Sequence, residues 1–367
     1  MNGFVAMFRK EITQMLRDRG TLLFALVIPV FELILFGVID MNAKHIPTVV
    51  FDQSHTQESR RLLDQFENTS YMDVIAEVPS RAALERAIVS GRAPVAIEIP
   101  PDYARNLAAG RQADVLIMID GSDQSVATQA LAAANGVVLQ QGLQDLLEKS
   151  GQRPRVEAHP VMMFNPDMRS ANLLIPGLIA ILLTFSGTIL SAFAIVKERE
   201  RGTLEQLMVT PVSPLAVVVG KLLPYLGLAY FQLILIVALM RFLFRVPING
   251  SLTLLLVLSP IYLVSLLALG LLVSSRARTQ MEAMQMAMGF MLPSVLLSGY
   301  VFPITSLPVP LQVVSHLLPA TYFIKIARGI VIRGADFVDL WQPVTALLAI
   351  SIVLIAASAR AFKKTVS

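Results

Sequence analysis

The feature that most constrains the fold is a series of six apolar segments, each about 20 residues long. A helix needs about 20 mostly apolar residues to cross the hydrocarbon core of a bilayer. These segments lie at residues 21–39, 173–196, 215–240, 252–273, 281–302 and 344–362. Proline inside a span is tolerated because neighbouring helices can satisfy the freed carbonyl. The sequence therefore predicts an α-helical membrane protein with six transmembrane helices.

The segment 41–170 differs from the rest of the chain because it holds most of the acidic residues and three of the four histidines. Short strand patterns at 48–51, 74–77, 95–99 and 115–119 alternate with helical patterns at 57–67, 80–89 and 102–109. A longer helical pattern follows at 125–149. Strands that alternate with helices are typical of βαβ units. We predict a mixed α/β domain inserted between transmembrane helices 1 and 2.

The basic residues set the orientation, because short cytoplasmic loops carry an excess of Lys and Arg. With the N-terminus in the cytoplasm, the inner flanks hold Arg9, Lys10, Arg17, Arg19, Lys197, Arg199, Arg201, Lys221, Arg276, Arg278, Arg360, Lys363 and Lys364. The short outer loops hold only Arg241, Arg245, Lys325, Arg328 and Arg333. Both termini are therefore predicted to be cytoplasmic and 41–170 extracytoplasmic. The net charge of +4 indicates membrane orientation rather than a nucleic-acid partner.

Residues 1–20 predict a cytoplasmic amphipathic helix that lies in the membrane interface before transmembrane helix 1 at 21–40. Apolar side chains recur at steps of three or four, at Phe4, Phe8, Ile12, Met15 and Leu16. Two interpretations stay open for this helix: a simple anchor, or a surface that contacts a cytoplasmic partner. The first span is too long for the apolar region of a cleavable signal peptide, and no A-x-A site follows it.

The sequence lacks the constellations that enzymes need. There is no cysteine, the four histidines lack metal-ligand spacing, and no nucleophile or carboxylate pair stands out. A phosphate-binding loop needs G-x-x-x-x-G-K-[ST]. Around the one Gly-Lys pair, Gly220–Lys221, the required Gly and Ser/Thr positions are Leu215 and Leu222. We therefore expect a chain that is not an enzyme and binds no metal or cofactor itself.

The loop 197–214, KERERGTLEQLMVTPVSP, carries the most specific pattern. Dense alternating charge precedes a Gly-Thr break and a short amphipathic turn, which Pro211 ends. By itself, this pattern fits either a charged loop or a rigid element that projects toward a partner. The run from Glu198 to Leu207, followed by Thr210-Pro211-Val212, resembles the signature of ABC-2-type transport permeases, in the drug and small-molecule exporter branch. Residues 96–103, 119–122 and 164–166 are similar to the outer domain of that branch.

The resemblance implies a coupling helix that seats in an ATP-binding subunit. The matching positions are Glu198, Glu200, Arg201, Gly202, Thr203, Glu205 and Pro211. It further implies a permease that moves a small amphipathic or hydrophobic, drug-like compound out across the bacterial inner membrane. A separate ABC ATPase subunit would hold ATP and Mg. The other implied partners are a second permease, identical or paralogous, and a periplasmic adaptor protein. Transmembrane helices 2–6, at 171–367, would include a re-entrant outer segment at 303–342.

Two features inside the spans are candidates for the translocation path. Glu32 lies near the middle of the first span, where an ionisable group is costly and often functional. It is either a neutral carboxyl bonded to a neighbouring helix or part of the path. Met281, Met284 and Met288 follow helical spacing on the fifth span and are either packing residues or an adaptable substrate wall.

Two other classes of function predict different sequence features. An ion- or proton-driven secondary transporter predicts inverted repeats and several ionisable residues at the bilayer midplane. The chain shows no repeat and one such residue, Glu32. A membrane-anchored sensor or assembly platform would not need a charged, structured loop at 197–214.

Overall fold

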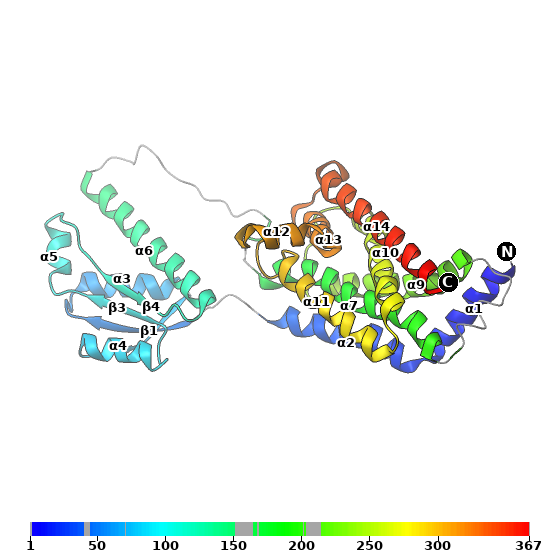
Figure 1. Cartoon of the computed structure of the whole chain (residues 1–367). Helices are drawn as coiled ribbons and strands as arrows, with labels where there is room; N and C mark the ends of the chain where they lie inside the picture. Colours follow the sequence, from blue (N-terminus) through cyan, green and yellow to red (C-terminus); the bar gives the residue numbers. More distant parts are fainter. Residues whose placement is uncertain are drawn as a thin grey trace. The chain divides into compact units, whose positions relative to one another are not determined.

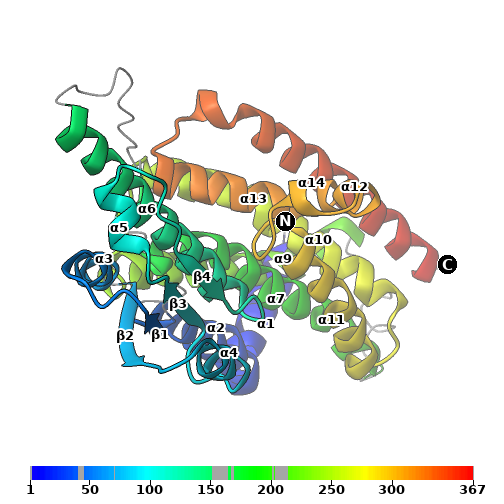
Figure 2. The ribbon, with the colours of Figure 1, turned by 90° about the vertical axis from the view of Figure 1, so that its left-hand side faces the viewer.

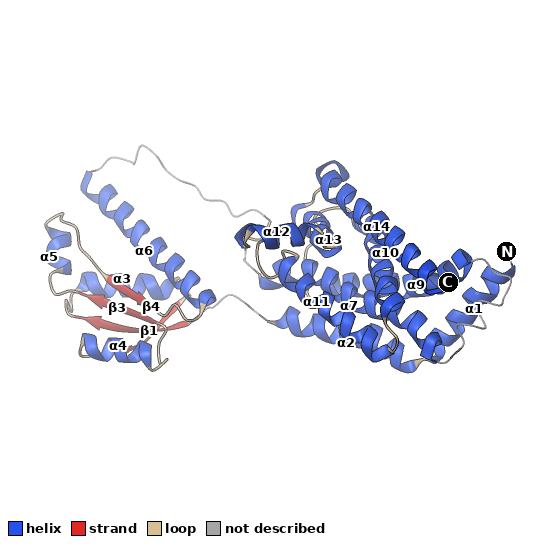
Figure 3. Cartoon of the chain, in the orientation of Figure 1, coloured by secondary structure: helices blue, strands red, loops and turns tan. Residues whose placement is uncertain are grey.

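A computed structural model of the protein describes residues 2–39, 45–69, 71–150, 164–166, 169–200, 202 and 214–366. The chain forms two compact units, Met1–Ile39 with Met163–Ser367, and Asp40–Met162. Among the described residues, all strands belong to the second unit, and the first unit is helical (Figure 1; Figure 3). The second unit is therefore an insertion in the sequence of the first.

The inserted unit, residues 40–162, contains a four-stranded sheet in the order β2-β1-β3-β4. Its strands are β1 (Ile46–Asp52), β2 (Met72–Glu77), β3 (Val95–Ile99) and β4 (Leu116–Ile119). β1 runs parallel to both β2 and β3, and β4 is antiparallel to β3. Parallel neighbours require crossover connections, which are provided by α3 (Gln57–Asn68) and α4 (Arg81–Val89).

Helices cover both faces of this sheet. α4 packs on one face, and α3, α5 (Tyr103–Ala108) and α6 (Gln124–Ser150) pack on the other (Figure 1; Figure 2). Val49 of β1 is buried with Leu84 of α4, whereas the next residue, Val50, is buried with Phe66 of α3. Successive strand residues point to opposite faces, so a sheet covered on both sides needs apolar residues at consecutive positions.

Two local features of the inserted unit follow from short polar side chains. Ser80, predicted as a helix start, caps α4, because its hydroxyl accepts a hydrogen bond from the Ala83 N–H at 3.2 Å. Asp120 begins a turn in which its Oδ1 accepts from the Ser122 N–H at 2.9 Å. Hydrogen bonds from the backbone and side chain of Ser122 lower the pKa of Asp120. The DGSD sequence at 120–123 therefore forms a turn that leads into α6.

The helical unit begins with two helices and continues after the insertion. Its helices are α1 (Asn2–Arg17), α2 (Arg19–Val38), α7 (Ser170–Glu200), α9 (Pro214–Phe242), α10 (Leu252–Arg276), α11 (Gln280–Leu297), α12 (Val309–His316), α13 (Pro319–Arg328) and α14 (Phe337–Val366). The short helical turn η1 (Ile304–Ser306) precedes α12, and η2 (Gly329–Arg333) follows α13.

Helix α7 is the centre of this unit. It packs against α2, α9, α10, α11 and α13. The most apolar window of α7 is 88% buried, whereas that of α14 is only 22% buried. A helix that is apolar all round must be enclosed by protein or lipid. α7 is enclosed by its neighbours, and α14 leaves a wide apolar surface exposed.

Buried hydroxyl groups join the central helices. The Tyr262 hydroxyl of α10 lies 2.5 Å from Thr184 Oγ1 and donates to the Ala180 carbonyl at 2.8 Å, both on α7. The Tyr262 ring stacks on Phe323 of α13, with the ring centres 4.3 Å apart. In an apolar surrounding, such a polar group needs a partner, and this one finds it on a neighbouring helix. The contacts fix α7, α10 and α13 against one another.

The described residues support four or five of the predicted six spans. Among the described residues, four helices are long and apolar enough to cross a membrane: Ser170–Glu200, Leu222–Phe242, Leu252–Arg276 and Phe337–Ala361. The pair Phe8–Arg17 and Leu22–Val38, bent by 61°, makes five if it is counted as one span. The predicted fifth span forms the shorter α11, in which Gln280, Glu282 and Gln285 lower the hydropathy. The last helix begins at Phe337 instead of 344 and contains Pro343.

Candidate functional site

The candidate site is the C-terminal turn of α7, where four consecutive charged residues, 197–200, leave the apolar bundle. These residues do not simply extend into solvent. Glu198 bonds to α1, and Lys197 bonds to Asp18, the residue that follows α1. Arg199 bonds to the end of α10, and Glu200 bonds to the start of α11. The end of α7 is therefore held from two sides.

Two ion pairs make the contact toward α1. Lys10 Nζ donates to Glu198 Oε1 at 3.2 Å, and Lys197 Nζ donates to Asp18 Oδ2 at 2.5 Å. The Glu198 side chain is only 9% exposed, whereas that of Lys10 is 43% exposed. A partly buried pair is screened less by water than a pair on the surface. This contact joins the amphipathic N-terminal helix to α7.

The contact toward α10 and α11 uses the polar ends of these helices. Arg199 Nη1 donates to the Ala277 carbonyl at 2.5 Å and lies 3.5 Å from the Ser274 carbonyl, at the C-terminal end of α10. The Glu200 carboxylate accepts from the Gln280 N–H at 2.7 Å and from the Gln280 side-chain amide, at the first residue of α11. A cation is stabilised at a helix C-terminus and an anion at an N-terminus. The two charges therefore match the two helix ends.

Gly202 continues this turn in a left-handed conformation. Its φ is +68°, and its N–H donates to the Arg199 carbonyl at 3.1 Å. Glycine adopts this conformation without the steric cost that a Cβ brings, and it often follows a helix end. Of the predicted coupling residues, Glu198, Glu200 and Gly202 thus lie together. Arg201, Thr203, Glu205 and Pro211 lie outside the described residues.

The candidate path residues are not brought together with this turn. Glu32 is half-buried on α2, and no described residue gives its side chain a hydrogen bond or ion pair. On α11, Met281 is 62% exposed and Met288 is 49% exposed, and Met284 is half-buried. These methionines therefore lie largely on the exposed side of α11. The side of α11 that packs on α7 holds Ala287 and Phe290.

Sequence reasoning missed the partners of the α7 turn. Lys10 and Asp18 were assigned only to an interface helix or its flank, and Gln280 and the carbonyl of Ala277 were not considered. The dense charge at 197–200 was the available signal, since alternating charges need partners, but it does not say which ones. The arrangement offers no reactive chemistry, and no described group of His, Asp and Glu could hold a metal ion. It connects α7 to α1 and to the ends of α10 and α11 by hydrogen bonds and ion pairs.

The chain is similar along nearly its whole length to known membrane transport proteins. The family described as "ABC-2 family transporter protein" matches residues 19–360. The chain is 29% identical over 351 residues to the probable multidrug ABC transporter permease YbhS of Escherichia coli, covering 94% of this chain and 93% of that protein. It is 28% identical over 363 residues to the probable multidrug ABC transporter permease YbhR, covering 98% of each chain. It is 26% identical over 367 residues to the inner membrane transport permease YhhJ, covering 97% of this chain and 96% of that protein.

Proposed function

Since the chain belongs to the ABC-2 family of transporter proteins, whose members are non-catalytic membrane subunits, we propose that it is the permease subunit of an ABC exporter. It is an integral inner-membrane protein, as its apolar helices and its permease relatives indicate. The cargo we propose is a small amphipathic or hydrophobic compound. This cargo class rests on the resemblance and on the word "multidrug" in the names of two relatives.

The main support for the proposal is that the C-terminal end of α7 is bonded both to the α1 region and to the ends of α10 and α11. A loop that transmits force must be joined firmly to the helices it moves. Here Glu198 and Lys197 join the turn to α1 and Asp18, while Arg199 and Glu200 join it to α10 and α11. We propose that the loop 197–214 seats in the ATPase. Its contact residues would be Glu198, Glu200, Arg201, Gly202, Thr203, Glu205 and Pro211.

The energy source in this proposal is a separate chain. The sequence holds no phosphate-binding loop, so ATP and Mg belong on the ATPase subunit and this chain binds no cofactor. ATP binding would bring two ATPase subunits together. The movement would pass through the α7 turn to α1, α10 and α11. Their displacement would change the bundle from inward-open to outward-open.

The proposed topology has six spans with both termini in the cytoplasm and residues 41–170 in the periplasm. α11 serves as the fifth span in this proposal. Its 18 residues give about 27 Å of helix, which is close to the thickness of the hydrocarbon core. The basic ends of α7 and α10, at Lys197, Arg199 and Arg276, face the cytoplasm. The segment 303–342 then lies on the outer side.

We further propose that two permeases, identical or paralogous, form the transport path between them. The exposed apolar side of α11, which includes Met281 and Met288, supports an interface or path position for this helix. Met284 and Glu32 are the other candidate path residues. A periplasmic adaptor protein, as a partner of residues 41–170, rests on the resemblance alone.

The test is a pull-down of the tagged chain from its native membrane in mild detergent, followed by mass spectrometry and an ATPase assay. Proline cannot adopt the φ of +68° found at Gly202, so a Glu205→Arg/Gly202→Pro variant should lose or uncouple the ATPase. Glu85→Arg, which changes an exposed charge on α4, is the control and should retain it. If no ATPase accompanies the parent chain under conditions that preserve other complexes, the exporter assignment fails. A secondary transporter or an assembly platform would then be favoured.

A further inference from the structure

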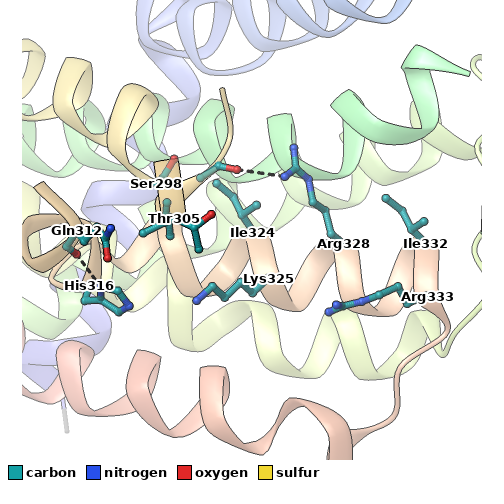
Figure 4. A pocket seen from close by; sticks show the side chains of 11 residues that line it. Ser298, Thr305, Gln312, His316, Ile324, Lys325, Arg328, Ile332 and Arg333 are labelled. Carbon is teal, nitrogen blue, oxygen red and sulfur yellow. Dashed lines mark hydrogen bonds between the residues drawn. The ribbon is translucent and has the colours of Figure 1, made fainter. Parts of the chain in front are cut away.

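A cavity of about 690 Å³ lies between the C-terminal end of α11 and the helices α12 and α13 (Figure 4). Ligand pockets commonly have volumes of about 300–1,000 Å³. The residues that decide its character are three cations and three isoleucines: Lys325, Arg328, Arg333, Ile304, Ile324 and Ile332. The cavity therefore combines a basic and an apolar lining.

The cations in this cavity have no acidic counterpart. No Asp or Glu lines it, and none of Lys325, Arg328 and Arg333 forms an ion pair with a described carboxylate. Arg328 is fixed in place, since its Nη1 donates to the Gly299 carbonyl at 3.1 Å and its Nη2 to the Tyr300 carbonyl at 3.3 Å. Both of these acceptors are neutral carbonyls, so the positive charge of Arg328 is not neutralised and can attract an anion.

The positions of the other two cations, Lys325 and Arg333, also favour an anion in this cavity. In Figure 4 the Lys325 side chain points along α13 toward His316, and the guanidinium of Arg333 points back toward Lys325. The cavity thus has two exposed cations, Lys325 and Arg333, and one, Arg328, that is held by backbone carbonyls. Arginine and lysine in such an arrangement suit a phosphate or carboxylate group.

Apolar side chains continue beyond the cavity, on α12. Three side chains of the adjacent α12 and its C-terminal end expose large apolar surfaces, namely Val309 (71%), Val313 (60%) and Leu317 (67%). A small inorganic anion would leave these surfaces and the three isoleucines without a role. An amphiphile could place its charged group among the cations and its apolar part along α12.

We propose that this cavity binds the anionic headgroup, phosphate or carboxylate, of an amphiphile at the outer side of the membrane. The position on the outer side rests on the proposed function and its topology. The amphiphile is either an anionic phospholipid of the bilayer or an exported anionic compound. Both sources share the chemistry that the cavity recognises.

The experiment uses the full chain with its co-purified ATPase in phosphatidylcholine nanodiscs. The nanodiscs contain a small fraction of one of two lipid probes, each with a photoactivatable acyl chain. The anionic probe is phosphatidylglycerol, and the zwitterionic probe is phosphatidylcholine. Labelling of residues 298–333 is measured by peptide mass spectrometry. The anionic probe should label this segment more than the zwitterionic probe does. Lys325→Gln/Arg333→Gln should lower the anionic labelling about thirtyfold, because two charges near the headgroup are lost. The control, Arg241→Gln/Arg245→Gln, removes two cations outside the cavity and should leave labelling unchanged.

Competition distinguishes the sources. Dodecyl phosphate should reduce labelling, whereas dodecylphosphocholine and inorganic phosphate should not. Binding of dodecyl phosphate without phosphatidylglycerol labelling would support the anionic site and assign it to an exported compound. Equal labelling by the two lipid probes, equal loss in the control variant, or full competition by inorganic phosphate would overturn the proposal. Retention of the ATPase is scored separately, so a failure of this proposal is distinct from a failure of the exporter assignment.

Discussion

The ion pair between Lys10 and Glu198 is expected to stabilise the helical unit more than a surface ion pair would. Two unit charges 3.2 Å apart attract each other by about 5 kcal/mol at an effective dielectric constant of about 20. Lys10 is 43% exposed, so water screens it, and the desolvation of Glu198 offsets a further part of the attraction. We therefore expect a coupling energy of about 1–2 kcal/mol.

A double-mutant cycle measures this coupling energy directly. The variants are Lys10→Gln, Glu198→Gln and the double variant, unfolded in mixed micelles with increasing dodecyl sulfate and followed by circular dichroism. The matched control is Arg81–Glu85, a pair on α4 at 3.3 Å with both side chains more than half exposed. Its expected coupling energy is about 0.3–0.5 kcal/mol. If the Lys10–Glu198 value does not exceed the control value, the pair does not clamp α1 to α7.

Three further predictions use the same unfolding assay. Gly202→Ala should lower the free energy of unfolding by about 1–2 kcal/mol through backbone strain, because φ is +68° and no atom of the described residues lies within 4 Å of the added Cβ. A larger loss would contradict this account. Gly270→Ala should destabilise strongly, since its Cβ would collide with the Thr188 carbonyl of α7. The Cβ of Gly289→Ala on α11 would contact none of the described residues, so this change should be neutral or stabilising. Tyr262→Phe should cost about 0.6–1.7 kcal/mol by removing the hydroxyl that joins α10 to α7, and an unchanged midpoint would show that these bonds do not stabilise the bundle.

The positions of most elements could be predicted because they depend on local patterns. Long apolar runs marked α7, α9, α10 and α14, and short β-branched runs marked the four strands to within two residues. The ends were harder to place. The apolar run of α7 stops at Val196, but the helix continues to Glu200, because the charged residues of its last turn bond to other helices. The pattern gives the end of the apolar run and not the end of the helix.

The site could be located but not assembled from the sequence. The charge density at 197–200 marks the turn at which the structure joins α7 to α1 and to α11. The pairing of Lys10 with Glu198 joins residues 188 positions apart, and no spacing rule relates them. The same holds for Glu200 and Gln280, which are 80 positions apart. The cavity between α11, α12 and α13 was missed because its cations, Lys325 and Arg333, were interpreted only as charges on a loop.

The central position of α7 has a consequence for how this chain can vary. Inserting or deleting one residue within a helix turns everything beyond that point by about 100° and shifts it by about 1.5 Å. Because α2, α9, α10, α11 and α13 all contact α7, such a turn would disturb several of these contacts at once and misplace the charged turn. Length changes should therefore be excluded from α7 in functional variants, and tolerated in loops such as 109–115 between α5 and β4. A library of single-residue insertions across the gene, selected for export, would display this contrast directly.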